Sequence, residues 1–315
     1  MRLKALLGCV AFLLLALCRP GLAQDKEPFL ILLTTPSPAL EERFRAGCEA
    51  AAAELKIACD VVALSGGPQE GIAKINEFIA SGGAGIVLQI YGGADDQAYV
   101  EAVKLARNAG LAVVIASTSL IEAASPFADI ATSIVGVDAE TFVSRVSDAI
   151  KTAGARNTAF CLLRFEQAPS PLKLAYDAVA KALEEAGAKR SEACPEALVF
   201  LGSFEETLLS AVRKLLAEQD VRFVILPFRA GSDYIDGLKQ IAAEAGRDTV
   251  FVSAWASPFE LSRTATWTLY QSERGEKVET TKAIPPTIQI STGAYCESCD
   301  CKKDTECKES CAKCN

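Results

Sequence analysis

Residues 85–116 decide the fold, and they read GIVLQIYGGADDQAYVEAVKLARNAGLAVVIA. Residues 85–90 form an almost unbroken apolar run, as expected of a strand that is buried on both faces of a parallel sheet. Residues 95–109 are rich in helix-forming side chains, and residues 111–116 are again apolar. A strand, a helix and a second strand at this spacing predict a βαβ unit, and hence a parallel sheet covered by helices.

The same alternation continues on both sides of this stretch. Before it, the pattern predicts strands at 29–33 and 57–64 and helices at 39–56 and 69–81. After it, the pattern predicts strands at 131–137, 158–163, 197–201, 223–226 and 249–254, and helices at 139–152, 171–186, 205–218, 234–245 and 258–273. The chain has 315 residues, enough for two domains of ordinary size. We therefore expect an α/β protein with two doubly wound parallel-sheet lobes, joined near Ser133–Asp138.

The first 23 residues have the features of a signal peptide. Arg2 and Lys4 precede an apolar run over residues 6–17, and small residues end the segment at Ala23. The run is shorter than the roughly 20 residues that span a bilayer, although a membrane anchor is the alternative. We predict cleavage after Ala23 and a periplasmic or secreted protein that is not embedded in the membrane.

Composition excludes several classes of function. The chain has no His, so it cannot build a Ser-His-Asp or Cys-His nucleophile or a His-ligated metal centre. We predict that it is not an enzyme and needs no cofactor, while carboxylate or Lys chemistry remains an alternative. The net charge is −8, and it becomes −11 when the signal peptide removes three cations and no acid. Such a chain repels phosphates, so we expect no nucleic acid partner.

Several segments together resemble one known family. They are Pro36-Ser37-Pro38 after the first strand, the unit at 85–115, Ile134-Val135-Gly136-Val137-Asp138, Leu174-Ala175-Tyr176, and Arg222-Phe223-Val224-Ile225. Their order resembles that of the type 1 periplasmic binding proteins, the ribose-binding-protein-like, sugar-type substrate-binding proteins. The chain departs from the sugar binders after the fourth strand, where Ser117-Thr118 stands in place of the usual Asp-Arg. The resemblance therefore implies the scaffold more strongly than a sugar ligand.

The resemblance also implies how the chain is divided. The expected N-terminal lobe comprises residues 24–136 with about 255–284, and the C-terminal lobe residues 137–254 with about 285–295. Hinges are expected near Val135–Asp138, Ser253–Ala256 and Pro285–Ile288. Residues 296–315 form a short Cys-rich tail outside both lobes.

In this fold, ligand contacts come from the loops after the C-terminal ends of strands. The candidate ligand-binding residues are Thr35, Ser37, Gln89, Tyr91, Ser117, Arg164, Phe165, Arg229, Asp233 and Trp255, with Thr118 and Asp138 as weaker candidates. They suit a small polar ligand, which aromatic rings stack on and hydroxyl and amide groups bond. Two arginines would also suit a carboxylate or phosphate group. The alternative for Arg229 is an ion pair with Asp233 across their loop.

The cysteines form two groups. In the body we expect the disulfides Cys48–Cys59 and Cys161–Cys194, with four buried thiols as the alternative. The tail holds Cys296, Cys299, Cys301, Cys307, Cys311 and Cys314. This segment has almost no apolar side chains, so disulfides or a metal must order it. Three disulfides are expected in an exported chain, and a thiolate site for Zn or Cu(I) is the rival.

The leading functional prediction is an extracytoplasmic solute-binding protein. It would capture a small polar ligand, a sugar or related metabolite, between its lobes and present it to a membrane permease or sensor protein. We expect it to act as a monomer. The alternative is an exported metal-handling or redox protein that acts through its Cys-rich tail.

Overall fold

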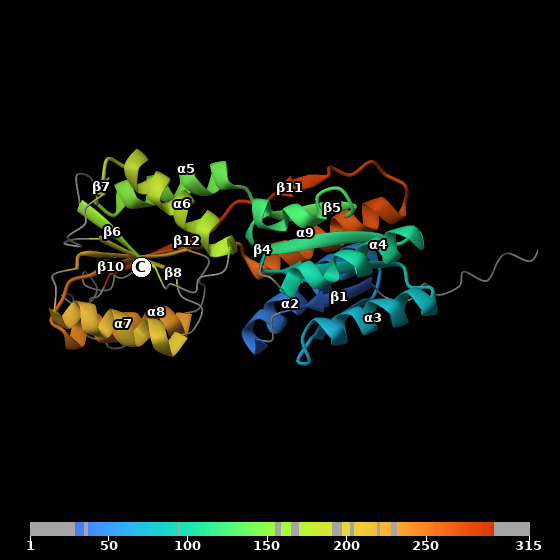
Figure 1. Ribbon diagram of the computed structural model, residues 1–315, viewed down its shortest axis with the longest axis horizontal. Helices are drawn as coiled ribbons and strands as arrows, with labels where there is room; N and C mark the ends of the chain where they lie inside the picture. The colour runs from blue at the N-terminus through green and yellow to red at the C-terminus, as the bar shows by residue number, and fades with distance from the viewer. Residues whose placement is uncertain are drawn as a thin grey trace, which may run out of the picture.

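The computed structural model describes residues 29–34, 37–92, 95–154, 159–164, 170–190, 197–201, 205–218, 221–227 and 232–292. Within these residues the strands form two six-stranded sheets, which lie side by side along the long axis of the molecule (Figure 1). The signal peptide and the Cys-rich tail predicted from the sequence lie outside the described residues.

The first sheet is parallel throughout and has the order β11-β5-β4-β3-β1-β2. Its strands are β1 (Phe29–Leu33), β2 (Cys59–Ala63), β3 (Gly85–Ile90), β4 (Ala112–Leu120), β5 (Ser133–Val137) and β11 (Thr281–Ala283). The second sheet has the order β12-β10-β9-β8-β6-β7 and is parallel except for β12. Its strands are β6 (Ala159–Arg164), β7 (Lys189–Arg190), β8 (Ala197–Leu201), β9 (Phe223–Pro227), β10 (Val250–Trp255) and β12 (Thr287–Thr292).

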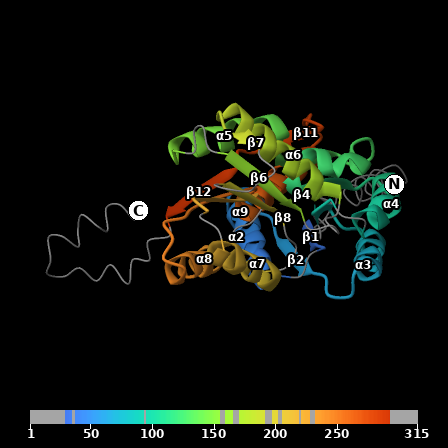
Figure 2. The same ribbon diagram turned by 60° about the vertical axis from the view of Figure 1, so that its left-hand side comes forward.

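Helices cover both faces of each sheet (Figures 1 and 2). Around the first sheet are α2 (Pro38–Leu55), α3 (Pro68–Ser81), the 3-10 helix η1 (Asp95–Tyr99), α4 (Val100–Asn108), the 3-10 helix η2 (Ile121–Phe127) and α9 (Pro258–Glu273). On the second sheet, α5 (Ala139–Thr152) and α6 (Ser170–Glu185) lie on one side, and α7 (Glu205–Glu218) and α8 (Ser232–Glu244) on the other. We call each sheet with its helices a lobe, first and second in that order.

Strand β1 shows why the apolar runs predict the architecture. Its five residues are all buried. Ile31 belongs to the core that also contains Phe44 of α2 and Leu261 of α9, whereas Leu32 belongs to the core beneath α3 and α4. Because successive side chains of a strand point to opposite faces, a run without polar residues needs helices on both sides. The sequence prediction of a parallel sheet covered on both faces is confirmed for the first lobe.

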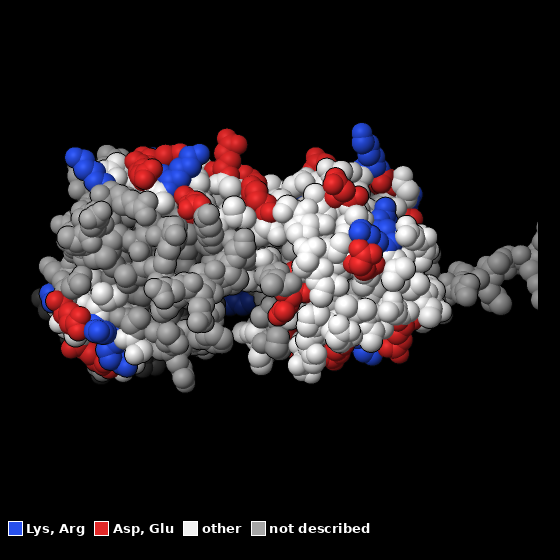
Figure 3. Space-filling view, in the orientation of Figure 1, with Lys and Arg blue, Asp and Glu red and all other residues white. Residues whose placement is uncertain are grey.

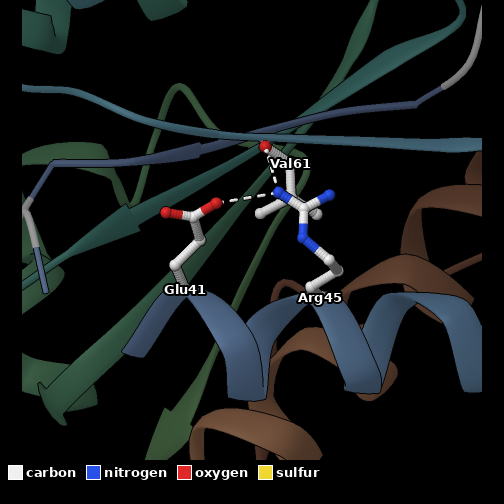
Figure 4. A network of polar contacts seen from close by, with 3 residues as sticks. All are labelled: Glu41, Arg45 and Val61. Carbon is white, nitrogen blue, oxygen red and sulfur yellow. Dashed lines mark hydrogen bonds and ion pairs between the residues drawn. The ribbon is translucent and has the colours of Figure 1, made fainter. Parts of the chain in front are cut away.

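A hydrogen bond and a disulfide connect helix α2 to the edge strand β2. Arg45 Nη2 donates to Glu41 Oε1 at 2.8 Å and to the backbone carbonyl of Val61 at 3.1 Å (Figure 4). The structure also contains the expected Cys48–Cys59 disulfide, whose Cα atoms lie 6.3 Å apart. Edge strands carry backbone groups with no neighbouring strand to pair with, so the Arg45 contact satisfies one of them.

Helix α9 follows β10 of the second sheet but packs against α2 in the first lobe. A Cβ atom at Gly47 of α2 would collide with the backbone carbonyl of Phe259, so only glycine allows the two helices to approach so closely. Ser262 Oγ of α9 then donates to the carbonyl of Phe44 at 2.7 Å. These contacts hold a segment from late in the chain against its beginning.

The chain passes between the sheets three times. The crossings contain Asp138 between β5 and α5, residues 256–257 between β10 and α9, and residues 284–286 between β11 and β12. The lobes also touch directly, because α6 contacts the end of β4 and η2. None of the helices in the described part of the chain is long and apolar enough to cross a membrane.

Several elements differ from the sequence prediction. The predicted helix at 95–109 begins as η1, and Asp96 Oδ2 in η1 accepts from the backbone N–H groups of Tyr91 and Gly92, which follow β3. Strand β4 continues to Leu120, four residues beyond its predicted end. Short β7, β11 and η2, and the antiparallel β12, were not predicted. The polar sequence of residues 117–119 resembles a loop, but Ser117 pairs with Ile90 of β3, and Leu120 pairs with Val137 of β5 after a register irregularity that begins at Ala116.

Candidate functional site

The C-terminal ends of both sets of parallel strands face the junction between the lobes. In the first sheet, β5 and β11 lead directly into crossings to the second lobe, and β1, β3 and β4 run in the same direction. In the second sheet, β10 leads into the crossing to α9, and β6, β8 and β9 are parallel to it. Ligands of open parallel sheets bind beyond these ends. The topology therefore brings two candidate binding edges together.

Gln89 joins three strand ends of the first lobe. Its side chain is fully buried. Its Oε1 accepts from the backbone N–H of Thr34 at 3.0 Å and from the Thr34 hydroxyl at 3.4 Å. Its Nε2 donates to Thr118 Oγ1 at 3.0 Å, and that hydroxyl donates to the carbonyl of Ile90 at 2.9 Å. The amide predicted as a ligand contact thus lies beneath the surface, and the half-buried Thr34 and Thr118 lie above it.

The other first-lobe candidates have different environments. Ser117 is fully buried, and its hydroxyl donates to the carbonyl of Leu120 at 3.1 Å. Tyr91 is half-buried and packs against the core, while its backbone N–H donates to Asp96 at 3.0 Å. Ser37 is half-buried at the start of α2, and its side chain makes no capping hydrogen bond. Ser37 and Tyr91 therefore keep exposed surface at the binding edge, whereas Ser117 is used internally.

In the second lobe, Trp255 is the candidate whose side chain is described. It ends β10, is half-buried, and lies opposite Thr287 of β12. Arg164 ends β6 and Asp233 lies in the first turn of α8, but their side chains are outside the described part of the structure. Thr35, Phe165 and Arg229 are also outside it, as are Cys194, the side chain of Cys161, and all six tail cysteines.

Asp138 occupies the first crossing as the N-cap of α5. Its Oδ1 accepts from the backbone N–H of Thr141 at 2.8 Å. Burial raises the pKa of its carboxyl, but hydrogen bonds from Thr141 and from the neighbouring backbone outweigh burial and lower the pKa below its ordinary value. Glu122 of η2 accepts from the backbone N–H of Ala139 at 3.1 Å. Two carboxylates therefore satisfy N–H groups at the start of this helix.

A groove of about 660 Å³ lies where the two lobes touch. The end of β4 and η2 form one wall, and α5 and α6 form the other. Its lining residues are Leu120, Glu122, Ala139, Glu140, Val143, Ser144, Leu174, Asp177, Ala178, Lys181 and Glu185. None of the predicted ligand-binding residues is among them. Figure 3 shows acidic side chains gathered along the top of this junction.

The described residues contain no group of three or more His, Cys, Asp or Glu side chains that could hold a metal ion. The site described so far consists of hydroxyl, amide and aromatic groups at two facing strand edges. Such groups bind neutral polar molecules through hydrogen bonds and ring stacking.

Solved structures similar to this chain share its two-sheet architecture. An ABC transporter periplasmic solute-binding protein from Actinobacillus succinogenes, with bound D-allose, superimposes with a TM-score of 0.62 at 13% identity, covering 84% of this chain and 97% of the other. A periplasmic ribose ABC transporter protein from Conexibacter woesei gives 0.61 at 18% identity, covering 85% and 92%. This is the fold of the periplasmic sugar-binding proteins.

A third protein with the periplasmic sugar-binding fold is a carbohydrate transporter protein from Acidothermus cellulolyticus in complex with myo-inositol. It gives a TM-score of 0.59 at 15% identity, covering 83% of this chain and 92% of the other. No protein-family model and no curated protein sequence matches the chain. The superpositions show the periplasmic sugar-binding fold, and identities of 13–18% leave the ligand to be argued from the site.

Two residues of the junction escaped the sequence prediction. Thr34 is adjacent to the predicted Thr35 and directly follows β1, so the positional rule could have included it. Glu122 lies in an unpredicted 3-10 helix, and its bond to Ala139 joins residues 17 positions apart. No local sequence pattern marks that contact.

Proposed function

We propose that this chain is an extracytoplasmic solute-binding protein that captures a small polar molecule, a sugar or related metabolite, between its two lobes. One observation carries the proposal: the C-terminal ends of both parallel strand sets face the same junction. The periplasmic sugar-binding fold supports it independently. We propose that the chain acts by binding: it lacks His, the usual general base near neutral pH, and carboxylate or Lys chemistry is the alternative.

The ligand chemistry follows from the residues at the two edges. Thr34, Thr118 and Ser37 supply half-buried hydroxyl groups from the first lobe. Trp255 supplies a half-buried aromatic face at the end of β10 in the second lobe. Hydroxyl groups bond the edge of a sugar, and an aromatic ring stacks against its apolar face. The proposed binding residues are therefore Ser37, Thr34, Thr118, Tyr91 and Trp255, with Gln89 holding two of them in place.

The two lobes are proposed to be domains that close on the ligand. Residues 24–136 with about 255–284 form one, and residues 137–254 with about 285–295 form the other. The three crossings are the hinges, because they are the only covalent links between the sheets within the described residues. The closed form is then presented to a membrane permease or sensor protein outside the cytoplasm.

Ligand binding is tested by thermal unfolding and tryptophan fluorescence of the mature protein. The probes are D-allose, D-ribose, myo-inositol, amino acids, nucleosides and sugar acids. A ligand at 100 times its Kd stabilises the folded state by about 2.7 kcal/mol, which raises Tm measurably. The chain has two tryptophans, Trp255 and Trp267, and Trp267 lies in α9 against Tyr270.

The tryptophan variants locate the response. With Trp267→Phe, the ligand-induced fluorescence change persists, because Trp255 remains. With Trp255→Phe, the change disappears and affinity falls. An unchanged Tm with every probe would contradict the proposed function, and a response retained in Trp255→Phe would remove Trp255 from the site.

A further inference from the structure

We propose that the groove between η2, α5 and α6 is a docking site for a basic amphipathic segment of a protein partner. The groove has a volume of about 660 Å³, and none of the residues proposed to bind the small ligand lines it. Its walls come from both lobes, with Glu122 of η2 on one side and residues of α5 and α6 on the other.

The floor of the groove is apolar. Leu120, Val143 and Ala178 are buried beneath it at 1%, 5% and 7% exposure. Leu174 of α6 lies at its surface with 39% of its area exposed. Only three large hydrophobic side chains are this exposed among the described residues, the others being Leu105 and Ile290. Leu174 and the apolar residues beneath it together form an apolar surface, against which an apolar side chain of a partner can pack.

The rim of the groove is acidic. Glu122, Glu140, Asp177 and Glu185 line it with a single cation, Lys181. Lys181 Nζ lies 3.9 Å from Glu185 Oε1, and both side chains are largely exposed, so this pair is weak. Glu140 and Asp177 form no ion pair with any described residue. The rim therefore retains an excess of negative charge that favours Lys or Arg side chains.

The apolar floor and the acidic rim together indicate which kind of segment can bind in the groove. A basic amphipathic helix places leucine-like side chains on one face and Lys or Arg along its margins, which matches both parts of the groove. The acidic rim opposes an acidic segment. A fully apolar segment would bury the rim carboxylates without a charged partner. Such burial costs free energy, so a fully apolar segment is disfavoured.

The position of the groove couples docking to the arrangement of the lobes. Glu122 Oε1 accepts from the backbone N–H of Ala139 across the first crossing, and α6 contacts both β4 and η2. A segment that touches both walls binds one lobe arrangement better than another, and so favours that arrangement. This coupling rests on the proposed function, whereas docking itself does not.

The probe is a synthetic fluorescent peptide with lysines on one helical face and leucines on the other. Fluorescence anisotropy measures its binding to the mature full-length protein at physiological ionic strength. The double variant Glu140→Lys/Asp177→Lys is expected to weaken binding by about tenfold, because it reverses the rim charge. Leu174→Ser leaves the net charge unchanged and is expected to weaken binding by about threefold to tenfold through loss of the apolar anchor.

The matched control is Glu49→Lys/Glu218→Lys, which changes the net charge equally on α2 and α7, elements that do not line the groove. It is expected to change affinity by less than about twofold. Thermal unfolding checks that each variant is folded. Equal weakening by both double variants would mean that net charge alone attracts the peptide, and would overturn the proposal.

Three further outcomes also decide against the docking site. One is no binding of the basic peptide at all. Another is equal binding of a peptide in which glutamates replace the lysines. The third is a dimer in sedimentation that Leu174→Ser dissociates, which would make a second copy the occupant. Finding no small ligand in the sugar panel leaves these results intact, so the two proposals fail separately.

Discussion

The side chain of Gln89 accepts a hydrogen bond from the backbone N–H of Thr34 at 3.0 Å, between two adjacent parallel strands. Parallel strands lose their regular pairing where they end. Gln89 replaces the missing strand partner of Thr34 and at the same time donates to Thr118 on β4. These bonds therefore fix the three strands of the first lobe relative to one another, and such preorganisation would reduce the entropy lost on the proposed ligand binding.

Replacing Gln89 by Met keeps the volume of the side chain and removes these bonds. We expect a loss of about 1–3 kcal/mol in the free energy of unfolding, because the N–H of Thr34 and the hydroxyl of Thr118 lose a partner. Urea denaturation measures the loss. Gln69→Met on the exposed surface of α3 is the control and should change stability by less than about 0.5 kcal/mol. Equal effects at both positions would refute the structural role of Gln89.

Replacing Asp138 by Ala removes the N-cap of α5 at the first crossing. The expected cost at neutral pH is about 1 kcal/mol. The pKa of Asp138 is lowered in the folded state, so the carboxylate stabilises the fold above its unfolded pKa near 4 and loses this effect as the pH falls through the folded pKa. The stability difference between the wild type and Asp138→Ala should therefore shrink in acid. Urea titrations at several pH values test this, and a difference independent of pH would contradict it.

Removing the Cys48–Cys59 disulfide should destabilise the first lobe. The cysteines are 11 positions apart, and closing a loop of this length is worth about 3 kcal/mol through the unfolded state. The double variant Cys48→Ala/Cys59→Ala removes the contact between the Thr266 hydroxyl and Cys48 Sγ. That hydroxyl keeps its hydrogen bond to the carbonyl of Ser262, so no buried donor loses its last acceptor. Thermal unfolding measures the change. If the double variant unfolds at the wild-type Tm, the disulfide contributes nothing to stability.

Lys56 is the C-cap of α2 and has a φ of 57°, the only positive φ of a non-glycine residue in the described chain. Its side chain is exposed, and Lys56→Gly should raise stability by about 0.5–1 kcal/mol because glycine adopts this conformation without strain. Ala109 is the C-cap of α4 and has a φ of −76°, so Ala109→Gly should instead lower stability by up to about 1 kcal/mol. Urea denaturation distinguishes the two, and the same sign for both variants would be inconsistent with this explanation.

Sequence patterns predicted the elements that depend on local composition. The apolar run at residues 29–33 must be buried on both faces whatever surrounds it, and the structure places it between two layers of helices. The Cys48–Cys59 pair could be expected because a strand directly follows the helix that carries Cys48. Of the candidate site, the rule that ligands bind beyond strand ends placed Ser37, Gln89 and Tyr91 at the C-terminal edge of the first sheet, and their role in binding stays a prediction.

Only the tertiary structure decided what those residues do. Gln89 and Ser117 follow the positional rule, but both are fully buried and bonded within the protein. The partner of Gln89, Thr34, is 55 residues away in the sequence, so no local pattern contains the bond. The same holds for Glu122 and Ala139, and for the groove between the lobes. Strand and helix formation follow from short-range periodicity, whereas a polar side chain's role depends on which distant backbone group the fold brings within hydrogen-bonding distance.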